Sequence, residues 1–74
     1  MASYNGHRSW NAWNVSLWIN NDEGLYNLAR RCIAETSNRS KAAARFLREV
    51  GEGAKTPDGG VYNLTTVKAA MVDM

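Results

Sequence analysis

Cysteine, histidine and proline each occur once in this 74-residue sequence. A single cysteine, Cys32, cannot form an internal disulfide, so the crosslinks of small secreted domains are missing and a reducing compartment is indicated. A structural zinc site needs several thiolate, imidazole or carboxylate ligands at workable spacing, and one histidine, His7, with one cysteine does not provide them. We therefore expect no metal site and no cofactor.

Long hydrophobic runs are also missing. No stretch approaches the roughly 18 apolar residues of a membrane span, and the N-terminal segment lacks the apolar run of a secretory signal. We expect a cytoplasmic protein that does not bind membranes. The Asn-x-Ser/Thr sequences that begin at Asn14, Asn38 and Asn63 are then expected to stay unglycosylated, because glycosylation requires a secretory route.

The groups that support enzymatic chemistry are sparse. Cys32 has no neighbouring base that would activate it as a nucleophile, and no paired carboxylates share one face of a predicted helix. The segment GEGAKTPDGG, residues 51–60, is rich in glycine and contains a lysine, yet it lacks the Gly-Lys-Ser/Thr ending of a phosphate-binding loop. We expect a protein that is not an enzyme and has no small-molecule substrate.

What the sequence does contain fits a small globular protein. Apolar residues make up 45% and charged residues 22% of the chain, which is typical of a folded domain. A chain of this length forms one domain at most, and such a domain is only marginally stable. We predict a single all-α domain over residues 1–74, a compact bundle of three to four short helices.

Capping residues and apolar spacing locate the first two helices. Ser9 is the predicted N-cap of a helix over 10–20. The acidic pair Asp22 and Glu23 suits the start of a second helix, because negative charge is favourable at a helix N-terminus. The apolar residues of this second helix recur at i, i+3, i+4, i+7 and i+8, which describes one buried stripe: Leu25, Leu28, Ala29, Cys32 and Ile33.

A third helix is predicted over 41–50, with its N-cap at Ser37 or Ser40. Gly51 is expected to end this helix in the left-handed conformation. The residues expected to be buried are Ala43, Phe46, Leu47 and Val50.

The two ends of the chain complete the predicted organisation. Residues 1–8 form an N-terminal extension, and residues 51–60 form a loop. A C-terminal helix falls within 61–74, capped by Asn63 or Thr65. A brief strand at Val61 and Tyr62 that pairs with residues 2–5 is also compatible with the pattern.

Three tryptophans, Trp10, Trp13 and Trp18, lie within the predicted first helix. This helix is apolar around most of its circumference and has no charged residue, so we expect it to be the central element, buried on more than one side. The leading interpretation places all three indoles in the core, because each buries a large apolar area. The alternative leaves Trp18 or Trp10 on the surface as an anchor for a protein partner, since tryptophan is enriched at interface hot spots.

Positive charge is concentrated between Gly24 and Arg48, where six basic residues accompany one acid, Glu35. Lys41, Arg45 and Arg48 are spaced i, i+4 and i+7, so they share one face of the third helix. This face either contacts phosphates or an acidic protein surface, or it is an ordinary solvated helix face. The candidate partner-binding residues are Arg30, Arg31, Arg39, Lys41, Arg45, Arg48 and Trp18.

A helix-turn-helix motif over residues 25–50 would place the basic third helix against nucleic acid. The connection ETSNRS contains no glycine and is longer than the turn of about three to four residues in that motif. The length of this connection disfavours the motif without excluding it.

A resemblance rests on two segments. The first is SYNGHRSWNAWNVSLWINNDEGLYNLARRCI, with the motif W-N-x-W-N-V-x-L-W-I-x-N-D-E-G-L-Y over residues 10–26. The second is KTPDGGVYN, residues 55–63. Both resemble a group of small, largely uncharacterised proteins encoded by bacteriophages and other bacterial mobile elements. This resemblance supplies no catalytic residues.

The resemblance implies an accessory protein made in an infected or plasmid-bearing bacterial cell. Such proteins commonly bind a host protein, and inhibition of a CRISPR-Cas or other defence complex is one known outcome. We therefore expect a non-enzymatic protein that binds and inhibits a bacterial host complex, most concretely a CRISPR-Cas effector. The alternative is a small basic nucleic-acid-binding protein that uses Arg30, Arg31, Lys41, Arg45 and Arg48.

Overall fold

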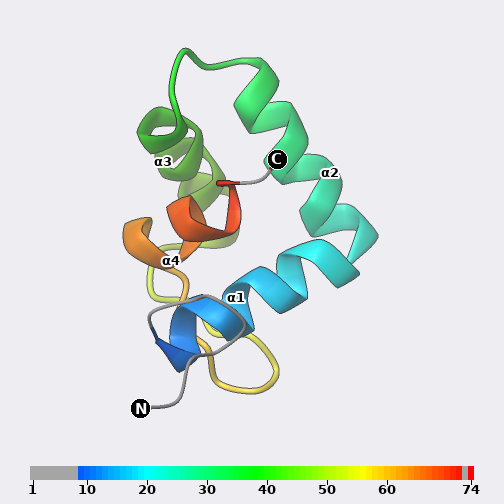
Figure 1. Cartoon of the computed structure of the whole chain (residues 1–74), viewed down its shortest axis with the longest axis vertical. Coiled ribbons are helices and arrows are strands. Elements are labelled where there is room, and N and C mark those ends of the chain that lie inside the picture. Colours follow the sequence, from blue (N-terminus) through cyan, green and yellow to red (C-terminus); the bar gives the residue numbers. More distant parts are fainter. Residues whose placement is uncertain (1–8, 73) are drawn as a thin grey trace.

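The computed structural model describes residues 9–72 and residue 74, and this part of the chain folds into four α-helices. Their bounds are α1 Trp10–Asn21, α2 Glu23–Ala34, α3 Arg39–Val50 and α4 Leu64–Ala70. Each helix packs against the next one along the chain, and α4 also packs against α1, so the four helices form a closed ring (Figure 1). The predicted small all-α bundle is confirmed.

Side-chain caps determine where α1 and α2 begin. The Ser9 hydroxyl accepts a hydrogen bond of 3.1 Å from the backbone N–H of Ala12, as predicted. The Asp22 carboxylate accepts one of 2.9 Å from the N–H of Leu25. Asp22 is also the C-cap of α1, so a single residue separates the two helices. The acidic pair therefore starts a helix, and Glu23 lies in the first turn, where it faces the positive end of the helix dipole.

α3 begins earlier than the sequence indicated. Asn38 is its N-cap, and the amide oxygen of Asn38 accepts a hydrogen bond of 2.8 Å from the N–H of Lys41. The predicted cap at Ser37 or Ser40 was wrong. Several short polar side chains in this segment are chemically able to cap a helix, and the first turn that actually forms places Ser40 inside α3.

The segment between α3 and α4 is a structured loop. Gly51 ends α3 with a positive φ of 94°, although its ψ of 118° lies outside the left-handed helical region expected for it. Lys55 and Val61 form an isolated antiparallel bridge. The described residues contain no strand at Val61 and Tyr62, where only this bridge forms; residues 2–5, the pairing partner predicted from the sequence, lie outside the described residues.

The C-terminal helix is shorter than the predicted segment 61–74. α4 starts at Leu64 because Asn63 and Thr66 form a capping box, in which each side chain accepts a hydrogen bond from the backbone N–H of the other, at 2.9 and 3.0 Å. The predicted cap at Asn63 is confirmed.

The core lies where α4 packs between α1 and α3. Phe46 is fully buried at its centre and its ring lies 6.3 Å from that of Tyr62, centroid to centroid. The other fully buried large side chains include Val15, Ile19, Val67 and Met71. The residues predicted to be buried in α3 are confirmed as core or as partly buried against it: Ala43, Phe46, Leu47 and Val50.

The tryptophans are not part of this core, so the expectation that all three indoles fill it was wrong. Trp10 is 37% exposed, and Trp13 and Trp18 are partly buried. The side of α1 that faces the core presents Val15 and Ile19 instead. Compact side chains let α4 approach α1 closely, whereas large indoles fit only on the flanks and the outer side of the helix.

Candidate functional site

Two of the candidate contact residues are engaged within the protein. Arg39 donates a hydrogen bond of 3.0 Å from Nε to the Met71 carbonyl, and its Nη2 donates to the main-chain oxygen of Met74. Arg39 thus ties the beginning of α3 to the segment that follows α4. Arg45 forms an ion pair of 3.3 Å with Glu35, and both side chains remain about half exposed. An exposed pair of this kind contributes only about 0–1 kcal/mol to stability.

Four other cations on α2 and α3 are unpaired within the described part of the chain: Arg30, Arg31, Lys41 and Arg48. Arg31, Lys41 and Arg48 are exposed and make no hydrogen bond or ion pair with the described residues. Lys41 and Arg48 lie on the same outward side of α3 as Arg45. Glu35, the C-cap of α2, follows Arg31 by four residues and pairs with Arg45, so Arg31 and Arg45 lie on the same side of the α2–α3 pair. We call Arg31, Lys41, Arg45 and Arg48 the α2–α3 basic face.

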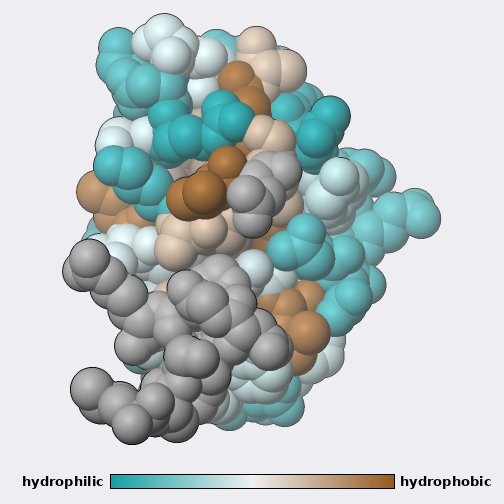
Figure 2. Space-filling model, in the orientation of Figure 1, coloured by the Kyte–Doolittle hydropathy of each residue, from teal (hydrophilic) through white to brown (hydrophobic). Residues whose placement is uncertain are grey.

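This face is positive without being uniformly basic. Glu35 pairs with Arg45, and Glu49 is an exposed acid of α3 that follows Arg48 directly, so carboxylates accompany the cations. Arg30 is exposed but precedes Arg31 in the chain, about 100° away around α2, and it therefore points in a different direction from the face. In Figure 2, hydrophilic residues project along the outer edge of α2, and smaller apolar patches lie between the hydrophilic ones elsewhere on the same view. The surface is mixed in polarity.

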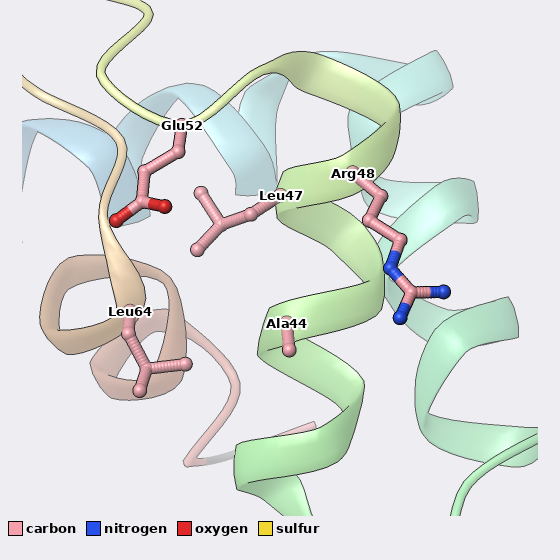
Figure 3. A pocket seen from close by; sticks show the side chains of 5 residues that line it. All are labelled: Ala44, Leu47, Arg48, Glu52 and Leu64. Atoms are coloured by element: carbon pink, nitrogen blue, oxygen red, sulfur yellow. The ribbon is translucent and has the colours of Figure 1, made fainter.

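A groove between α3 and α4 adjoins the basic face. Its volume is about 320 Å³, and its lining residues are Ala44, Leu47, Arg48, Glu52 and Leu64. Figure 3 shows Leu47 and Leu64 extending into the gap from the two helices, and the Glu52 carboxylate at one end of it. Arg48 extends from α3 in the direction away from Leu64 (Figure 3). Because Leu64 is 44% exposed, the groove presents apolar surface to water, with the Glu52 carboxylate at one end of it (Figure 3).

Trp18, the aromatic candidate, helps to hold the glycine-rich loop on α1. The Asp58 carboxylate accepts hydrogen bonds from the Trp18 indole N–H at 2.9 Å and from the Asn14 amide at 3.1 Å. These two bonds lower the pKa of Asp58, that of Trp18 having the larger effect. The Thr56 hydroxyl donates to the Asn14 side-chain oxygen and accepts a bond of 2.8 Å from the N–H of Gly60. We call these five residues the loop network.

The loop network depends on a close backbone approach. Asn14 is 1% exposed, and a Cβ atom added to Gly60 would lie only 2.6 Å from its Oδ1 atom. Residue 60 must therefore be glycine for the loop to reach the buried amide. Trp18 is consequently engaged within the molecule, and Trp10 is the most exposed indole among the described tryptophans.

Cys32 is buried, and burial raises the pKa of its thiol despite the nearby Arg45 and Arg31. The interpretation of Cys32 as a small buried apolar side chain is confirmed. Among the described residues, no three His, Cys, Asp or Glu side chains lie close enough together to hold a metal ion; His7 lies outside them. No described helix is long and apolar enough to cross a membrane.

Comparison with known proteins places the chain in a family. The model of a family of unknown function, DUF7249, matches residues 1–74. The chain belongs to this family. No curated protein and no solved structure matches the DUF7249 chain. The candidate sites of this chain are the two surfaces described above, the α2–α3 basic face and the adjoining groove.

Two features of the DUF7249 chain were missed in the sequence analysis. The groove joins Leu64 to α3, and the loop network joins Asn14 to residues 56–60. Both depend on contacts between residues far apart in the chain, which helical spacing does not reveal. One signal was present for the network: Asn14 lies next to the apolar Val15 in an uncharged helix, where a buried amide needs hydrogen-bond partners.

Proposed function

We propose that this protein is a non-enzymatic binding protein that docks its α2–α3 basic face on an acidic surface of a bacterial protein complex and inhibits that complex. The observation that supports this proposal is the set of three unpaired, exposed cations on adjacent helices, Arg31, Lys41 and Arg48. Charges that are not neutralised within the protein are available to the carboxylates of a partner. Complementary charge accelerates association and selects among partners.

A protein partner fits this surface better than a polyanion. A carboxylate, that of Glu35, lies among the cations and pairs with Arg45, and the neighbouring groove exposes apolar side chains. Protein interfaces combine an apolar centre with a polar rim, whereas a nucleic-acid interface is much more uniformly positive. The mixed polarity therefore favours a protein.

The biological setting in the proposal comes from the resemblance over residues 10–26 and 55–63 to phage and mobile-element proteins. We place the protein in the cytoplasm of the bacterial host, with a CRISPR-Cas effector as the most concrete target. A defence complex that binds nucleic acid has positive surfaces for that purpose, so a basic inhibitor would use a separate acidic patch. It would not act as a mimic of DNA, which requires negative charge.

The proposal is tested with two double variants that change charge equally. Arg31→Glu/Lys41→Glu reverses two cations of the basic face, and Arg30→Glu/Lys55→Glu makes the same two replacements at exposed sites outside it. Each protein is expressed in bacteria with an active CRISPR-Cas system that targets an infecting phage. The wild type and the control variant are expected to restore plaque formation, and the face variant is expected to lose about tenfold or more of that effect.

Two results of this assay would contradict the proposal. If the face variant restores plaques as well as the wild type, the basic face is not the contact surface. If the wild type restores none against CRISPR-Cas systems of several types, the specific target is wrong.

Nucleic-acid binding is the second candidate function, and one observation favours it. α2 ends at Ala34 and α3 begins at Arg39, so their connection has the length of about three to four residues found in helix-turn-helix motifs. This short turn removes the argument from length against the motif, although residues 35–38 still contain no glycine. The outward side of α3, with Lys41, Arg45 and Arg48, would then face the DNA.

Short duplex DNA, titrated at low and moderate salt, tests this candidate. Phosphate contacts predict an affinity that falls steeply as salt rises and that is weaker in Arg31→Glu/Lys41→Glu than in Arg30→Glu/Lys55→Glu. Absence of binding at low salt would end this candidate function.

A further inference from the structure

The groove between α3 and α4 indicates which side chains a partner would use to bind there. This inference rests on the proposed function, in which the basic face binds an acidic protein. We infer that the groove receives one large aliphatic or aromatic side chain from an acidic segment of the partner, whose carboxylates contact the basic face. The inference rests on the shape and lining of the groove and on the position of Arg48, which belongs to both surfaces.

The lining of the groove suits a single apolar anchor. Ala44 and Leu47 come from α3 and Leu64 from α4. These three supply the apolar lining of the groove, whose volume is about 320 Å³. Leu64 is 44% exposed, so its apolar surface contacts water. A partner side chain in the groove would remove that surface from water, which is favourable. Interface hot spots are typically large side chains inserted into pockets of this kind.

Charge determines how the partner segment lies. Arg48 lines the groove and extends on the side of α3 away from Leu64 (Figure 3), where it shares the outward side of the helix with Lys41. Acidic residues next to the anchor are attracted to that side. Glu52 stands at one end of the groove and repels a carboxylate there. The partner segment is therefore expected to have its acids on one side of the anchor only.

Two other occupants fit the groove less well. Nucleic acid would meet Glu52, and the lining contains no aromatic ring on which a base would stack. A second copy of this chain, with a formal net charge of +2, would approach Arg48 and the rest of the basic face with charge of the same sign. An acidic protein segment satisfies both the apolar lining and the charge.

The experiment selects short random peptides displayed on phage against the immobilised wild-type protein. Enriched peptides are then synthesised, and their affinity is measured by fluorescence anisotropy. We expect them to contain a Leu, Ile, Met, Phe or Trp with Asp or Glu on one side of it. Two variants disrupt the groove: Leu64→Ser removes its exposed wall, and Ala44→Gln fills its floor.

Leu17→Ser is the matched control, because Leu17 is exposed to a similar degree, 37% against 44% for Leu64, and lies on α1. We expect each groove variant to lose about tenfold or more in affinity for the selected peptides. The control is expected to bind as the wild type does. Both mutated groove residues are exposed, and circular dichroism of each variant establishes that its helices are retained.

The outcomes separate this inference from the proposed function. Enriched acidic peptides that lack an apolar anchor, and that bind Leu64→Ser and Ala44→Gln normally but lose affinity for Arg31→Glu/Lys41→Glu, would overturn the groove inference alone. Peptides without acidic residues that bind Arg31→Glu/Lys41→Glu normally would contradict both. A selection that enriches no peptide, or a protein that binds only duplex DNA, would also overturn the inference.

Discussion

α1 and α3 have the same length and opposite surface chemistry. Each has 12 residues. α3 contains five charged residues, and most of its exposed surface is charged, whereas α1 contains none and exposes Trp10 and Leu17. Both nevertheless bury one face against α4. A helix can therefore pack equally well with a charged or an apolar outer face. Only in the charged case does the sequence indicate which side of the helix faces the core.

The buried faces of the two helices differ in what selects them. In α3, the charged residues must stay in water because burying an unpaired charge is very costly, so Phe46 and its apolar neighbours turn inward. In α1, apolar residues outnumber the positions that face the core. Close packing of Val15 and Ile19 and the hydrogen bonds of the buried Asn14 then select the inner side.

The largest expected effect comes from truncating the aromatic core residue of α3. Phe46→Ala should reduce the free energy of unfolding by about 3–5 kcal/mol, because the ring is fully buried and its removal leaves a cavity. Urea denaturation followed by circular dichroism measures the change. Since small domains have only about 5–15 kcal/mol of stability, the variant is expected to be partly unfolded at 37 °C. A loss below about 1 kcal/mol would contradict the central place of Phe46.

The next largest effect tests the polar part of the inner side of α1. Asn14→Leu should reduce the free energy of unfolding by about 1–3 kcal/mol although leucine is more apolar, because Thr56 and Asp58 each lose one of their hydrogen bonds. The double variant Asn14→Leu/Thr56→Val should lose less than the sum of the two single losses, since the two residues share one hydrogen bond. Purely additive losses would argue against a coupled network.

These two helices also delimit what the sequence can predict. The caps at Ser9 and Asn63, the helix start at Asp22 and the buried side of α3 depend on neighbours within a few positions, so local spacing predicted them correctly. The roles of Arg39 and Asn14 depend on residues more than 30 positions away. No local pattern distinguishes Arg39, which is bonded to the segment after α4, from Lys41, which is exposed.

The position of the tryptophans was unpredictable for a related reason. Apolar content alone favours burial of the largest side chains. In α1, however, there are more apolar residues than positions on the side that faces the core. The choice between Trp10 and Val15 depends on how closely α4 approaches, which is a property of the assembled bundle. The candidate contact residues were likewise found by their charge, while their division into engaged and unpaired cations required the fold.

A smaller effect is expected at the outer side of α1. Trp10→Ala should reduce the free energy of unfolding by about 1 kcal/mol or less, because a partly exposed indole buries only part of its surface and leaves no closed cavity. Urea titration of Trp10→Ala and Phe46→Ala under the same conditions compares the loss of one aromatic residue from each helix. Equal losses in the two variants would remove the distinction between the outer side of α1 and the inner side of α3.

The smallest effect concerns how the loop is held on α1, and it depends on pH. Hydrogen bonds from Trp18 and then Asn14 lower the pKa of Asp58 in the folded protein, below the value of about 3.9 for an unfolded chain. The carboxylate therefore adds stability that is complete above the unfolded value and is lost as pH falls through the lower folded pKa. Asp58→Asn should be less stable than the wild type at pH 7, and the difference should shrink as pH falls below about 4.

Urea titrations at several pH values, monitored by indole fluorescence, measure this difference. Glu52→Gln provides the control for general carboxylate titration, because Glu52 accepts no hydrogen bond from the described residues. If the gap between Asp58→Asn and the wild type stays constant from pH 7 to pH 3, the bonds from α1 do not stabilise the charged form of Asp58. The loop would then be held by Asn14, Thr56 and the close approach of Gly60 alone.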